Sequence, residues 1–171
     1  SGNAESYGAE ILLQKKLGKW TGWAAYTLSW TWLQFDEVNS GERYFAKYDR
    51  RHDISLVSIF NSTKELSINA VWVFASGNAI SLPQETYSAS IDYDDSGPYS
   101  VNNSHYVTYY GPKNAFRMNP YHRLDIGFQF HKELKRGSRT LEFSVYNLYN
   151  RKNPFFYYID YVDQNGQSKS V

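Results

Sequence analysis

The chain has 171 residues, enough for one domain with a core. Its 18 lysines and arginines against 17 aspartates and glutamates leave a net charge of +1, without the basic excess typical of proteins that bind nucleic acid. The lack of cysteine excludes disulfides, thiolate metal sites and cysteine nucleophiles. Aromatic residues make up 18%, and the mean hydropathy of −0.61 indicates a chain that is neither disordered nor uniformly apolar.

No apolar run approaches the ~18–20 residues that a membrane-spanning helix requires. The longest uninterrupted run is Ala70–Ala75. Residues Ser1–Glu5 lack the basic and apolar regions of a signal peptide. Because the sequence starts without methionine, we expect a processed chain or a piece of a longer one.

Apolar and polar residues alternate with a period of two through most of the chain, which predicts β-strands. The alternation is clearest from residue 121 to 131, where Leu124, Ile126 and Phe128 are separated by polar or small residues. In chain order, strands are expected at Tyr7–Gln14, Trp20–Trp32, Tyr48–Asn61, Leu66–Phe74, Tyr121–His131 and Arg139–Asn147, with a seventh candidate at Phe155–Val162.

The connections between these strands alternate in length. Short connections at residues 17–19, 61–65 and 135–138 predict hairpins. Long connections occupy residues 34–47 and 78–120, and residues 163–171 are expected to form a turn or loop. Antiparallel strands therefore place the short turns at one end of the sheet and the long loops at the other.

Several strands keep their alternation for roughly nine to thirteen residues, which is the length of membrane-barrel strands rather than of soluble ones. Trp20 and Trp30 share one face ten residues apart, which corresponds to ~25 Å along a membrane normal for a strand tilted by about 40°. The opposite face is polar and suits a wet or plugged lumen. An aromatic girdle is expected from Trp20, Trp30, Trp32, Trp72, Phe128 and Phe130.

The predicted fold is therefore all-β: an antiparallel transmembrane β-barrel segment of about six or seven strands. A sheet open at both ends cannot lie in lipid, so the rest of the barrel is expected elsewhere. The alternative is a soluble sandwich or small barrel that binds an apolar ligand, because the alternation does not say which face meets lipid. Dependence on detergent separates these two hypotheses.

Six stretches of the chain carry motifs that can be compared with a known family. They are Tyr7–Lys16, Gly18–Ser29, Tyr48–Asp53, Trp72–Gly77 with Leu82 and Pro83, Tyr121–Asp125, and Tyr146–Pro154. Taken in order, these stretches resemble the late barrel strands of TonB-dependent outer-membrane receptors of the SusC-like or carboxypeptidase-regulatory-like type. Each motif alone is weak, but the ordered set covers nearly the whole chain and is specific.

The resemblance implies a barrel of about 22 strands plugged by an N-terminal domain. Residues 1–171 would be its C-terminal portion, without the plug domain and the final strand. The implied function is import of a bulky nutrient across the bacterial outer membrane by gated active transport. The implied partners are the rest of the barrel and its plug, the TonB complex through the missing N-terminal part, the nutrient and membrane lipid; receptors of this kind often also work with a surface lipoprotein.

Two strand starts carry an arginine and an aspartate two residues apart on one face. They are Arg51 with Asp53, preceded by Asp49, and Arg123 with Asp125. If this face lines the lumen, these residues form a charge ladder across neighbouring strands. We expect the ladder to stabilise the wall, with contact to substrate or plug as the alternative.

No motif indicates an enzyme, a metal or a cofactor, and none is expected. The four histidines lack the spacing and carboxylate support of a metal site, and His52 and His122 follow the apolar alternation. Three aspartates at 92, 94 and 95 lack the glycine and glutamate of an EF-hand loop. A barrel-wall hydrolase using Ser55 or Ser144 is the third hypothesis, although no Gly-x-Ser-x-Gly motif supports it.

The long connection at residues 78–120 is the best candidate for ligand contact. Tyrosine together with small polar residues makes rigid and adaptable contacts with sugars, peptides or a protein lid. Loops of this length without regular structure are usually functional. The alternative is a loop that packs over the barrel mouth or extends the strands. The tyrosines proposed for contact are Tyr87, Tyr93, Tyr99, Tyr106, Tyr109 and Tyr110.

Overall fold

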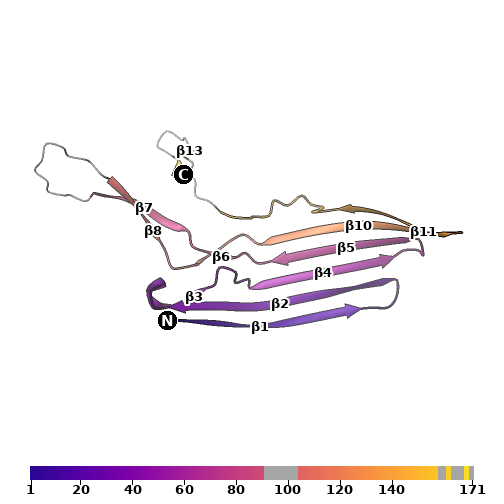
Figure 1. Cartoon of the computed structure of the whole chain (residues 1–171), viewed down its shortest axis with the longest axis horizontal. Helices are drawn as coiled ribbons and strands as arrows, with labels where there is room; N and C mark the ends of the chain where they lie inside the picture. The colour runs from indigo at the N-terminus through magenta and orange to yellow at the C-terminus, as the bar shows by residue number, and fades with distance from the viewer. Residues whose placement is uncertain (91–103, 158–160, 163–167, 170–171) are drawn as a thin grey trace, which may run out of the picture.

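The computed structural model describes residues 1–90, 104–157, 161–162 and 168–169. Its main feature is one antiparallel sheet whose strands follow the order β1-β2-β4-β5-β10-β11, with the short β3 paired to β2 (Figure 1). The bounds are β1 Gly2–Lys15, β2 Trp20–Phe35, β3 Tyr44–Phe45, β4 His52–Asn61, β5 Leu66–Ala75, β10 Tyr121–Leu134 and β11 Gly137–Val145. The prediction of an all-β antiparallel architecture is confirmed.

Smaller elements lie in the connections. A short 3-10 helix η1 covers Asn39–Gly41. Within the long connection between β5 and β10, β6 (Ala79–Ile80) pairs with β9 (Phe116–Arg117), and β7 (Pro83–Ser90) pairs with β8 (Ser104–Tyr110). Near the end of the chain, β12 (Tyr161–Val162) pairs with β13 (Ser168–Lys169). No helix in the described ranges is long and apolar enough to cross a membrane.

Two strands begin later than predicted, and one connection is more regular than predicted. The strand expected from Tyr48 begins only at His52, because residues 46–51 turn away to satisfy the edge of β2. The seventh strand expected at Phe155–Val162 is absent at residues 155–157, and β12 begins only at Tyr161. The connection at 78–120 is not irregular, since its described residues contain four strands.

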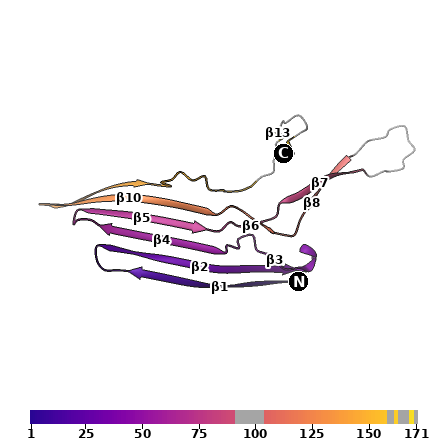
Figure 2. The same ribbon diagram turned by 180° about the vertical axis from the view of Figure 1, so that it is seen from behind.

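The short turns all lie at one end of the sheet and the long connections at the other, as predicted. The turns join β1 to β2, β4 to β5, and β10 to β11 (Figures 1 and 2). At the opposite end, the β7–β8 hairpin projects beyond the sheet (Figure 1). Below, these are called the turn end and the loop end, and the hairpin with its root strands β6 and β9 is called the arm.

The strand registers place the alternating apolar residues of all six strands on the same face of the sheet. Residues paired across antiparallel strands share a face, and each register runs without a shift along the six strands. One such row crosses the sheet as Leu13, Ala24, Leu56, Trp72 and Leu124. The adjacent row on the opposite face contains Leu12, Ala25, Ser55, Val73 and Arg123. The apolar face is therefore continuous from β1 to β11.

The sheet forms a single layer, and in the described residues nothing covers its apolar face. Only Tyr44, Ala46, Ala75 and Ala79 are buried apolar residues in the described part of the chain, and all four lie towards the loop end. On the apolar face, Leu13 is 67% exposed and Phe143 is 58% exposed. The sheet is also open, because β1 and β11 each pair on one side only within the described ranges.

Gly22 lies in β2 opposite Ser58 of β4, and the β4 backbone leaves no room for a side chain there. Its φ is +148°, and a Cβ at this position would lie 2.0 Å from the carbonyl oxygen of Val57. Because Gly22→Ala forces the two strands apart, we expect it to lower the free energy of unfolding by about 1–3 kcal/mol. Thr21→Ala is the matched control one residue earlier. Chemical unfolding of the native protein measures both variants, and equal losses would contradict the argument from close approach.

Candidate functional site

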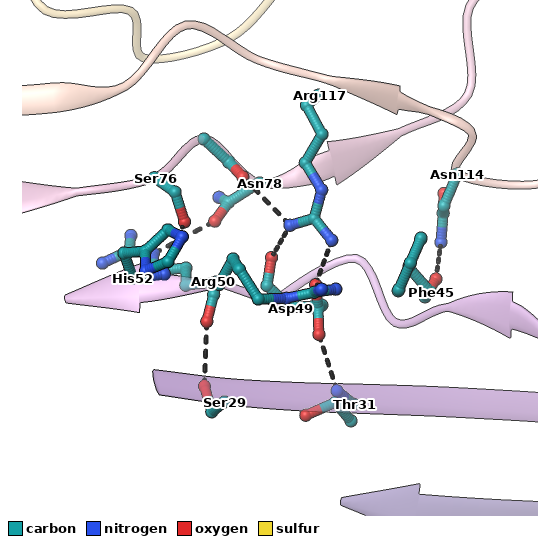
Figure 3. A network of polar contacts seen from close by, with 12 residues as sticks. Ser29, Thr31, Phe45, Asp49, Arg50, His52, Ser76, Asn78, Asn114 and Arg117 are labelled. Carbon is teal, nitrogen blue, oxygen red and sulfur yellow. Dashed lines mark hydrogen bonds and ion pairs between the residues drawn. The ribbon is translucent and has the colours of Figure 1, made fainter. Parts of the chain in front are cut away.

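A cluster of polar side chains around the buried Asp49 lies at the loop end, where the ladder between β2 and β4 stops. The last paired residues are Leu28 and His52. Beyond them, the Thr31 N–H donates to Asp49 Oδ1 at 2.6 Å (Figure 3). The Ala46 N–H donates to the Thr31 carbonyl at 3.0 Å. A side-chain carboxylate thus replaces the missing strand at the edge of β2 and satisfies its backbone.

Asp49 is 1% exposed and lies between two arginines. Its Oδ2 forms an ion pair with Arg117 Nη2, and Arg51 Nη2 lies 3.6 Å from the same oxygen. Arg117 Nη1 also donates to the Asp49 carbonyl at 2.7 Å. Since Arg117 belongs to β9, this carboxylate connects the root of the arm to β2 (Figure 3).

The two guanidinium groups share an aromatic support. Arg51 Cζ lies 4.7 Å from the Trp30 ring centroid and 5.2 Å from that of Phe45, and Arg117 Cζ lies 4.7 Å from that of Phe45. Cation–π attraction holds both groups against these rings. Within the described residues, the buried Nε of Arg51 has no hydrogen-bond partner.

Further hydrogen bonds fasten the arm root to the connection between β2 and β4. The buried Asn114 donates from Nδ2 to the Phe45 carbonyl at 2.7 Å, and the Arg50 Nε donates to Asn78 Oδ1 at 3.1 Å (Figure 3). The Lys113 N–H donates to Asn39 Oδ1 at 2.8 Å. The arm is therefore anchored at its root by side chains from the other long connection.

Four of the tyrosines proposed for ligand contact, Tyr87, Tyr106, Tyr109 and Tyr110, belong to strands of this arm. Tyr87, Tyr109 and Tyr110 are 54%, 54% and 55% exposed. Tyr106 belongs to β8, while Tyr93 and Tyr99 lie outside the described residues. A cleft of about 670 Å³ separates the arm root from η1, and its lining includes Glu42, Ser81, Tyr109, Tyr110 and Lys113.

The second charged pair lies at the start of β10. Arg123 Nε is 3.0 Å from Asp125 Oδ2, and Asp125 Oδ1 accepts the Asn147 N–H at 2.9 Å. The two charged pairs do not lie on neighbouring strands, because β5 separates β4 from β10: Ala75 pairs with both Asp53 and Tyr121. The ion pair of Arg51 is with Asp49, within one loop, and the ion pair of Arg123 is within one strand.

A second side chain also acts as a strand substitute. Beyond the ladder between β10 and β11, Asn153 Oδ1 accepts the His122 N–H and its Nδ2 donates to the His122 carbonyl, both at 3.0 Å. Arg151 Nη2 donates to the Pro120 carbonyl at 3.0 Å. Residues 147–153 are thereby held along the first residues of β10.

Aromatic side chains of the apolar face concentrate at its two ends. At the turn end, the register aligns Trp20, Phe60, Phe128 and Phe143 in one cross-strand row, interrupted by Ile68. At the loop end, stacked or edge contacts join Tyr7 to Trp30, Tyr26 to His52, and Phe74 to His122. Of the other proposed girdle residues, Phe130 contacts Phe143, Trp72 stacks with Phe74, and Trp32 stacks on Phe45.

Sequence reasoning missed Arg117 and Asn114, which hold the arm root, and Thr31, whose backbone the Asp49 carboxylate satisfies. Each is an isolated polar residue in an unremarkable context, and only their contacts with Asp49 and Phe45 reveal their role. Within the described ranges, no three histidine, aspartate or glutamate side chains lie close enough together to hold a metal ion. The contacts of Asp49, Arg117 and Asn114 anchor the arm root to the connection between β2 and β4.

No protein-family model, curated protein or solved structure matches this chain.

Proposed function

We propose that this chain is part of the wall of a TonB-dependent transporter in a bacterial outer membrane, which imports a bulky nutrient by gated active transport. The observation that carries the proposal is the continuous apolar face of a single-layer sheet with long strands. Such a large exposed apolar surface is unfavourable in water and favourable against lipid chains. The opposite face, with its serine, threonine and charged residues, suits a water-filled or plugged interior.

At the loop end, the aromatic residues of the apolar face extend further along β2 than along β10. His122 pairs with Phe74, and Phe74 pairs with Ile54. Ile54 in turn pairs with Tyr26, which lies four residues from Trp30 along β2. Four residues span ~13 Å along a strand while three strand spacings span ~14 Å, so a membrane plane that passes through both His122 and Trp30 corresponds to a strand tilt of ~40°. Outer-membrane strands tilt by about 35–45°.

The two unpaired edges of the sheet, β1 and β11, support the proposal that it belongs to a larger barrel. Unpaired backbone groups of β1 and β11 cannot face lipid, so each edge requires a further strand. We assign those strands, and the plug that couples to TonB, to other parts of the native protein. In this proposal the anchored arm, with Tyr87, Tyr109 and Tyr110, meets the nutrient or a surface lipoprotein, and the Asp49 cluster holds it in place.

The intact mass of the native polypeptide tests the proposal first. A barrel of about 22 strands with a plug requires a mass several times the 19.9 kDa of this chain. The same preparation should require detergent to stay in solution. A mass of 19.9 kDa would overturn the transporter proposal, and solubility without detergent would favour a soluble β-protein whose apolar face binds a ligand.

A further inference from the structure

Basic residues concentrate at the turn end of the sheet. Residues 15–19, 62–65 and 132–139 contain eight of the 18 lysines and arginines but only two acidic residues, Glu65 and Glu133. The rest of the chain is therefore acidic overall, since the whole chain carries only +1. The eight are Lys15, Lys16, Lys19, Lys64, Lys132, Lys135, Arg136 and Arg139.

Three of these cations end the apolar face. Lys132 follows Phe130 by two residues on β10, and its register partner on β11 is Arg139, which precedes Leu141 by two. Lys15 follows Leu13 in the same way on β1. The face thus passes from aliphatic to aromatic to cationic residues toward the turn end. In a lipid leaflet, such residues lie against the acyl chains, the interface and the headgroups, in that order.

The pairing of Lys132 with Arg139 places two like charges directly opposite each other. Such cross-strand pairs are destabilising unless something compensates for the repulsion. Glu133, the nearest acidic residue in sequence, is 3.0 Å from His131 Nε2. In the described part of the chain no lysine takes part in an ion pair. An anion between Lys132 and Arg139 would remove the repulsion.

We propose that the turn end binds the headgroups of anionic phospholipids, with Lys132 and Arg139 bridged by one phosphate. The inference rests on the proposed membrane location of the sheet. It adds a lipid preference to that proposal: phosphatidylglycerol should stay bound to the protein in preference to a zwitterionic lipid. Each cation close to such a surface contributes a factor of about five to retention.

The test uses the native protein reconstituted into nanodiscs of phosphatidylcholine, with or without an equal share of phosphatidylglycerol. Lipids that remain bound are counted by native mass spectrometry, and the midpoint of thermal unfolding is measured in both discs. The variants are Lys132→Glu and Lys132→Gln, with Lys47→Glu at the loop end as the matched control. A further arm adds inorganic phosphate to the phosphatidylcholine discs.

We expect phosphatidylglycerol to be retained preferentially and to raise the unfolding midpoint, and Lys132→Gln to reduce that retention about fivefold. Lys132→Glu should raise the midpoint in phosphatidylcholine, where it now attracts Arg139, and abolish the gain from phosphatidylglycerol. Lys47→Glu should change neither quantity. Equal retention of both lipids by the embedded wild type, or the same stabilisation by inorganic phosphate alone, would overturn the lipid assignment only. A protein that stays outside the bilayer and retains neither lipid would overturn the membrane proposal as well.

Discussion

Asp49→Asn is expected to release the arm from the sheet and to lower the free energy of unfolding by about 3 kcal/mol. The Asp49 carboxylate is fully buried, so its removal leaves Arg117 and Arg51 without their counter-charge in a partly desolvated site. The Thr31 N–H also loses a charge-assisted hydrogen bond. Hydrogen exchange in the native protein should therefore quicken around residues 29–31 and 114–118.

The matched control for this variant is Asp53→Asn. Asp53 lies four residues further along and within β4, where its backbone pairs with Ala75. We expect hydrogen exchange at the arm root to stay at the wild-type rate in this variant. If Asp49→Asn and Asp53→Asn quickened exchange to the same extent, the buried carboxylate would not be the anchor of the arm.

Leu56→Arg is expected to destabilise the protein in a bilayer by about 2–4 kcal/mol, the cost of an arginine near the midplane of a lipid-facing strand. Leu56 is 40% exposed on the apolar face, and its partner Ala24 lies between Trp20 and Trp30 along β2. The position is thus near the middle of the apolar band. Chemical unfolding of the native protein in phosphatidylcholine vesicles measures the loss.

Ser55→Arg is the control on the other face of the same strand. Ser55 is the sequence neighbour of Leu56 and pairs with Ala25 and Val73. An arginine there would meet the polar interior, so we expect a change below about 1 kcal/mol. If the two variants lost equal stability, or if Ser55→Arg lost more, the assignment of the lipid face would be reversed.

The regular part of the sheet could be predicted closely from local pattern. In Tyr121–His131 each residue type follows its face, so the strand needed no knowledge of its neighbours and appears as β10, Tyr121–Leu134. The three hairpins were equally predictable, because the turn residues of each lie between two segments in which apolar and polar residues alternate. Prediction was poorer at 48–51 and 155–157, where aromatic and charged residues follow one another and no period of two can be recognised.

The candidate site was less predictable than the sheet. Asp49 and Arg51 were singled out by the similarity of two strand starts, but they form an ion pair with each other within one loop instead of a ladder across neighbouring strands. The main partner of Asp49 is Arg117, which lies 68 residues away in sequence. No local pattern connects the two, because the intervening sheet brings them together.

The sequence by itself determined the antiparallel class, the hairpins and the two-faced character of each strand, since these depend on side-chain alternation and turn chemistry within a few residues. Only the tertiary structure decided that the apolar sets of six strands fall on one face, because register depends on pairing between strands. It also decided which side chains anchor the arm. At the points where the strand ladders end, unpaired backbone groups must find partners, and Asp49 and Asn153 supply them from segments distant in the chain.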